Sequence, residues 1–118
     1  MKITDVYGIA AGSPPISGLD NAPNVARAAE IVRDALGIEL QSWTSDAWNG
    51  TYYRYSGKDY GNVLIVNNAV DDDFDDMPFL QYPEYGVVIE VHAAGRPDDV
   101  RVTLTAAGFV HIQRSTLG

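Results

Sequence analysis

The stretch NVARAAEIVRDALGIEL, residues 24–40, decides how the rest of the chain can fold. Six of its apolar residues recur at the spacing of one helix face: Val25, Ala28, Ala29, Val32, Ala35 and Leu36. Pro23 is tolerated only in the first turn of a helix, and Gly37 stands where a helix takes a left-handed residue after its last turn. The spacing therefore predicts a helix over 22–36, followed by a half-buried strand over 38–43, where apolar and polar residues alternate.

A second helix is predicted over 97–107, near the other end of the chain. Pro97 suits the first helical position, and Asp98 and Asp99 complement the positive end of the helix dipole. Gly108 ends the helix, and FVHIQRS, residues 109–115, forms the last strand. The likeness between ALGIEL and AAGFVHI is too brief to establish a duplication.

The remaining β-prone runs complete the predicted fold. They cover 2–10, 51–56, 61–68 and 85–93, and Asn49-Gly50 predicts a hairpin turn before the second of them. The continuous apolar centre of 61–68 indicates burial on both faces. The order β-α-β-β-β-β-α-β predicts an α+β domain: a mainly antiparallel sheet of about five to six strands with two helices packed on one face. The residues expected to be buried are Val25, Val32, Leu36, Ile38, Leu64, Val66, Ile89 and Leu104.

Length and composition restrict the class of protein. The 118 residues fit a single domain spanning 1–118, and 46% hydrophobic residues suffice for a core. The formal net charge of −8 disfavours nucleic acid and anionic lipid and favours a basic partner. There is no cysteine, no convincing signal peptide and no apolar run near the ~20 residues that span a bilayer, so a cytoplasmic protein is expected.

The most unusual segment is DDDFDD, residues 71–76, with five carboxylates around one aromatic ring. Asp71, Asp73 and Asp75 alternate as in a calcium loop, but Asp76 stands where that loop needs glycine and Tyr82 where it needs glutamate. A solvated loop, an irregular ion site and a docking surface remain open. Charge around an aromatic anchor is typical of a protein interface. The candidate partner-binding residues here are Asp71, Asp72, Asp73, Phe74, Asp75, Asp76 and Glu84.

The aromatic stretch 42–55 supplies two more candidates, Trp48 and Tyr53, although packing within a hairpin explains most of its rings. No catalytic set can be named. His92 and His111 could be neighbours in a sheet and, with Glu90, bind a metal, but alternation also places such residues on a solvent face. The sequence therefore predicts no enzyme, no cofactor, no catalytic residue and no metal ligand.

Three segments carry a resemblance to a known class of protein: ALGIELQSWTSDAWNGTYYRY (35–55), NVLIVNNAVDDDFDDMPFLQYPEYGVVIEV (62–91) and DDVRVTLTAAGFVHIQRS (98–115). In organisation they resemble the small acidic immunity proteins of bacterial polymorphic toxin and contact-dependent inhibition systems. The resemblance covers roughly 20–115 and implies a non-enzymatic inhibitor that binds a cognate toxin domain and blocks its active site or substrate surface. Many such toxins are nucleases with basic clefts.

Two alternatives stay open at this point. One is a small ligand- or metal-binding regulatory domain. The other is an acidic DNA-mimic inhibitor, in which carboxylates spread along a whole face. The concentration of carboxylates in 71–76 disfavours a mimic.

Overall fold

The computed structural model describes residues 2–10, 18–45, 50–57, 60–68, 85–92 and 94–117. Within these residues, two helices and six strands follow one another along the chain. They are β1 (Lys2–Ala10), α1 (Gly18–Leu36), β2 (Gln41–Ser45), β3 (Gly50–Gly57), β4 (Gly61–Asn67), β5 (Tyr85–His92), α2 (Pro97–Ala106) and β6 (Val110–Leu117). This is the predicted order of elements.

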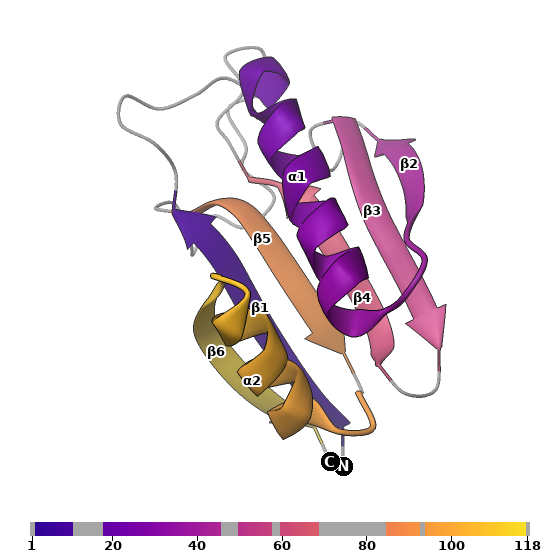
Figure 1. Cartoon of the computed structure of the whole chain (residues 1–118), viewed down its shortest axis with the longest axis vertical. Coiled ribbons are helices and arrows are strands. Elements are labelled where there is room, and N and C mark those ends of the chain that lie inside the picture. Colours follow the sequence, from indigo (N-terminus) through magenta and orange to yellow (C-terminus); the bar gives the residue numbers. More distant parts are fainter. Residues whose placement is uncertain are drawn as a thin grey trace.

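The six strands form one sheet in the order β2-β3-β4-β5-β1-β6, and every neighbouring pair is antiparallel (Figure 1). Strands β2 to β5 follow the chain as a meander. Strand β1 is first in sequence but lies between β5 and β6, so β5, α2 and β6 form a crossover around it. The predicted fold class, an α+β domain with an antiparallel sheet, is confirmed.

Both helices cover the same face of the sheet, as predicted (Figure 1). Helix α1 packs across β3, β4 and β5, whereas α2 contacts β6 and α1. The main core lies between the helices and this face. Its buried side chains are Tyr7, Val25, Ala28, Ala29, Val32, Leu36, Ile38, Val63, Ile65, Val87, Ile89, Val91, Val100, Leu104 and Phe109. Neither described helix covers the opposite face of the sheet, which we call the helix-free face.

Seven of the eight predicted core residues are buried, and Leu64 is the exception. The side chains of a strand alternate between faces, so Leu64 points away from Val63 and Ile65, which face the helices. The Cα partners of Leu64 on that side are Arg54 and Glu90, so Leu64 lies at the edge of the apolar cluster there and is only half-buried. The burial of Val66 on that face confirms that β4 is buried on both sides.

The starts of two elements differ from the prediction by three residues or more. Helix α1 begins at Gly18 rather than at residue 22, which places Pro23 inside the helix, where its missing N–H removes one regular hydrogen bond. Strand β2 begins at Gln41 rather than at Ile38, because Ile38 is buried against the main core directly after the helix. Gly37 and Gly108 have positive φ angles of 66° and 107°, which confirms both predicted helix ends.

A smaller apolar cluster lies on the helix-free face. Val6, Val66 and Val88 are buried there, and Tyr52, Leu64, Tyr85 and Ile112 pack around them. Gly8 of β1 is part of this packing. A Cβ atom on Gly8 would lie 2.7 Å from Cδ1 of Tyr85 and 2.9 Å from Cδ1 of Ile112, so only glycine lets these two side chains meet over the strand.

Neither α1 nor α2 combines the length and the apolarity that a membrane-crossing helix requires.

Candidate partner-binding site

The predicted acidic site lies outside the described residues, but both of its attachment points are within them. Asp71, Asp72, Asp73, Phe74, Asp75, Asp76 and Glu84 all belong to the connection 69–84 between β4 and β5. Asn67 and Asn68 are buried at the end of β4. The Asn68 backbone N–H donates to the Gly86 carbonyl at 2.8 Å, and its side-chain amide donates to the Tyr85 carbonyl at 3.0 Å. The two ends of the acidic connection are therefore joined to β4 and β5 where these strands are hydrogen-bonded to each other.

The predicted aromatic candidates differ in what the structure shows of them. Trp48 lies outside the described residues. Tyr53 is half-buried and packs against the main core on the helix side, so its ring has a packing role. Its neighbour Tyr52 faces the other way, beside Val66 on the helix-free face. Trp43, the Cα partner of Tyr52 in β2, has 50% of its surface exposed.

The two histidines do not form a joint site. Strand β1 separates β5 from β6, and the side chains point to opposite faces because His92 pairs with Thr4, whereas His111 pairs with Tyr7. His92 Nδ1 lies 2.6 Å from Thr4 Oγ1. The possibility that the two histidines are neighbours in the sheet does not hold, because β1 lies between their strands. Within the part of the chain that the structure describes, no three His, Asp or Glu side chains are grouped to hold a metal ion.

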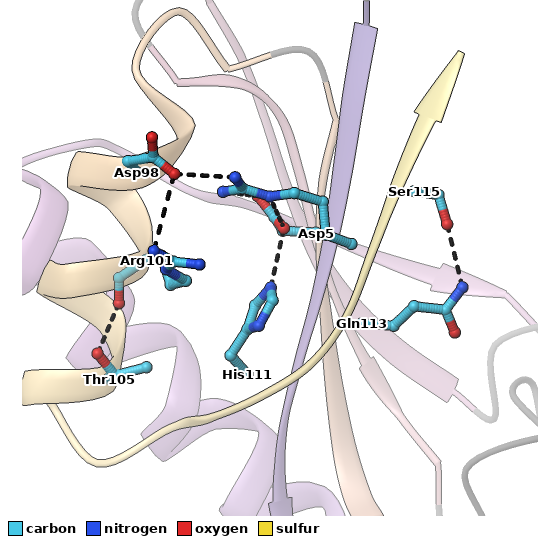
Figure 2. Close-up of polar contacts among 8 residues, drawn as sticks. Asp5, Asp98, Arg101, Thr105, His111, Gln113 and Ser115 are labelled. Atoms are coloured by element: carbon cyan, nitrogen blue, oxygen red, sulfur yellow. Dashed lines mark hydrogen bonds and ion pairs between the residues drawn. The ribbon is translucent and has the colours of Figure 1, made fainter.

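A polar network that the sequence analysis did not predict ties β1, β6 and α2 together (Figure 2). Asp5 is 2% exposed and accepts hydrogen bonds from both neighbouring side chains of β6. Arg114 donates through Nε at 2.8 Å and through Nη2 at 3.1 Å, and His111 Nε2 lies 2.8 Å from the same carboxylate. Arg114 also donates to Asp98 of α2 at 2.8 Å. All these contacts span long sequence distances, so local spacing gave no signal for them.

The electrostatics of this network favour its charged form. Burial alone would raise the pKa of Asp5, but the hydrogen bonds and charges of Arg114 and His111 outweigh burial, so that the pKa lies below its ordinary value of 3.8. Hydrogen bonds to Asp5 and Asp98 raise the pKa of Arg114. Burial and the charge of Asp5 raise the pKa of the Tyr7 hydroxyl. The network holds three elements together, and both oxygens of the Asp5 carboxylate already accept hydrogen bonds within it.

A cleft of about 490 Å³ lies between the end of α1 and the start of α2. Its polar lining comes from Tyr60, Arg96, Asp99 and Thr103. One cationic and one anionic side chain share this cleft, and they indicate no particular class of ligand.

The chain matches no protein-family model and no curated protein sequence. Its function therefore has to be argued from its own charges, surfaces and fold.

Proposed function

We propose that this chain is an immunity protein that binds a cognate toxin domain and neutralises it by covering its active site or substrate surface. The observation that carries the proposal is the location of the negative charge. Without the five carboxylates of 71–76, the formal net charge would be −3 rather than −8. Most of the excess charge therefore belongs to one connection between two adjacent strands, which favours attraction of a cationic protein surface to that part of the molecule.

The frame around this connection supports a binding role. Strands β4 and β5 are central in the sheet, and the buried Asn67 and Asn68 hold the end of β4 against the start of β5. Binding residues on loops work well when a rigid scaffold fixes the ends of the loop.

The proposed mechanism has two stages. The negative field of the acidic connection attracts a toxin domain with a basic cleft, such as a nuclease, and raises the rate of association. Phe74 then serves as an apolar anchor within the charged rim. The protein acts in the cytoplasm as a non-enzymatic inhibitor without a cofactor, and its net charge of −8 keeps it from nucleic acid and membrane surfaces.

The first test is protection of growth. The C-terminal domain encoded by the reading frame immediately upstream is expressed in a bacterial host, alone and together with this chain. We expect that domain to be toxic alone and harmless together with this chain. A domain without toxicity, or growth that this chain does not restore, would overturn the proposal.

The second test separates the two stages by stopped-flow and calorimetric titration with that domain, inactivated by substitution of a catalytic residue. Changing Asp72, Asp73 and Asp75 together to Asn should slow association and flatten its dependence on salt, because exposed charges act mainly on the on-rate. Phe74→Ala should act mainly on dissociation and cost more than ~1 kcal/mol of binding energy. Wild-type affinity and salt slope in the triple variant would show that 71–76 is only a solvated loop.

A further inference from the structure

Two adjoining hollows take most of their polar lining from side chains of the helix-free face, although Tyr55 of the helix side also borders both. One, of about 520 Å³, is lined by Glu39, Gln41, Trp43 and Ser56, and the other, of about 380 Å³, by Tyr52, Asn62, Leu64, Glu90 and His92. Arg54 lines both. The strand register explains why these side chains share a face. Gln41 and Leu64 are the Cα partners of Arg54, and Glu90 is the Cα partner of Leu64.

Charges of alternating sign follow one another across these hollows. Glu39 lies in the first hollow, Arg54 between the two, and Glu90 in the second. Among the described residues, none of these three charges forms an ion pair with another side chain. The ion pairs between described residues lie on the helices and in the network around Asp5. Within the described part of the chain, this surface therefore carries a negative, a positive and a negative charge that no ion pair neutralises.

An aromatic pair lies beside these charges. Trp43 is half-exposed and is paired with Tyr52, whose ring is partly buried against Val66. Tryptophan, tyrosine and arginine are the residue types most enriched among interface hot spots. The indole and phenol rings also offer faces to a cationic side chain, which the flanking carboxylates would draw in.

We infer that this surface, which we call the Trp43 face (Glu39, Trp43, Tyr52, Arg54, Leu64 and Glu90), is a second contact area for the toxin domain. The inference rests on the proposed function and specifies the partner's surface. The fitting surface carries a carboxylate between two cationic side chains, with an apolar group that covers the Trp43 ring. A uniformly basic surface does not fit, because Arg54 would repel it. The acidic connection supplies attraction to any basic protein, whereas the Trp43 face selects the cognate one.

The test uses the same inactivated upstream domain in calorimetric titrations. Trp43→Ala should weaken binding by about tenfold or more, mainly through faster dissociation. Arg54→Glu should also weaken binding although it makes the chain more acidic. That sign is decisive, because long-range attraction alone predicts tighter binding for the more acidic variant. Val102→Ala is the matched control, since Val102 of α2 is 65% exposed on the helix side, and it should leave the affinity unchanged.

The possible outcomes separate this inference from the proposed function. Wild-type affinity in Trp43→Ala, or tighter binding by Arg54→Glu, would overturn the role of the Trp43 face while leaving the proposed function in place. The absence of a complex with the wild-type chain would overturn both. Far-ultraviolet circular dichroism and thermal unfolding should show that each variant is folded as the wild type is, because Trp43 and Arg54 are exposed.

Discussion

At the scale of single residues, the buried charge of Asp5 is the centre of the polar network that connects β1, β6 and α2. Asp5 is only 2% exposed, but its carboxylate accepts hydrogen bonds from Arg114 and His111. Arg114 also donates a hydrogen bond to Asp98 of α2. A buried charge with such partners is tolerated, whereas the same charge without them destabilises the fold. The contribution of this network to stability therefore depends on each partner being present.

The first stability prediction concerns Arg114→Met, which keeps the aliphatic stem but removes the guanidinium. Asp5 would remain buried with only His111 beside it, so we expect a loss of about 3 kcal/mol in the free energy of unfolding. Urea denaturation at neutral pH measures this loss. Asp98→Asn is the control, because the Asp98 side chain is 72% exposed and its ion pair should contribute little. Equal effects of the two changes would show that the buried carboxylate is not the centre of the network.

The pH dependence of stability follows from the lowered pKa of Asp5. Its folded-state pKa lies below the ordinary value of 3.8, so the network stabilises the protein fully above that value and loses this contribution as pH falls through the folded-state pKa. Asp5→Asn should lower stability at pH 7 and reduce the stability difference between pH 7 and pH 3. Thermal unfolding at both pH values measures this difference. An undiminished difference in Asp5→Asn would assign the acid sensitivity to other carboxylates.

At the scale of elements, the helices and strands were predictable because each carries its own local signal. Val25 and Val32 repeat at helical spacing and are buried, and Gly37 and Gly108 end the helices with positive φ. For β4, it was harder to predict how deeply each side chain would be buried on each face of the sheet. Its apolar residues run continuously, so the sequence did not show that Leu64 would be left half-buried on the helix-free side.

The main core gives the element-scale prediction. Ile89 of β5 is fully buried between the sheet and the helices, so Ile89→Ala should lower the free energy of unfolding by ~2–5 kcal/mol through lost burial and a residual cavity. Val102→Ala on the exposed side of α2 should change it by less than about 0.5 kcal/mol. Chemical denaturation of both variants gives the comparison. Equal losses would mean that β5 does not form the centre of the core.

At the scale of the whole molecule, charge and topology are the features that distinguish this domain. Local patterns predicted the class of fold but not the place of β1 between β5 and β6, because strand order depends on contacts between distant segments. For the same reason they missed the Asp5 network and the separation of His92 from His111. The Trp43 face could not be predicted either, since it is assembled by the register of β2, β3, β4 and β5.

The acidic connection gives the prediction at this scale. Changing Asp72, Asp73 and Asp75 to Asn should leave stability unchanged or raise it slightly at low salt, because like charges repel one another. The difference from wild type should shrink as salt is added, since salt screens exposed charges. Thermal unfolding over a salt series tests this. A marked loss of stability would show that these carboxylates make stabilising contacts within the fold.

The central position of β1 has a consequence for how the chain folds. Lys2 pairs with Leu117, and the whole of β1 pairs only with strands that follow much later in the sequence. During synthesis, β1 can pair with β5 only after residue 92 has been added and with β6 only after residue 117. Pairings between such distant segments slow folding, because a long loop must close before any contact forms. Until β6 has been made, the Asp5 carboxylate lacks both Arg114 and His111 as hydrogen-bond partners.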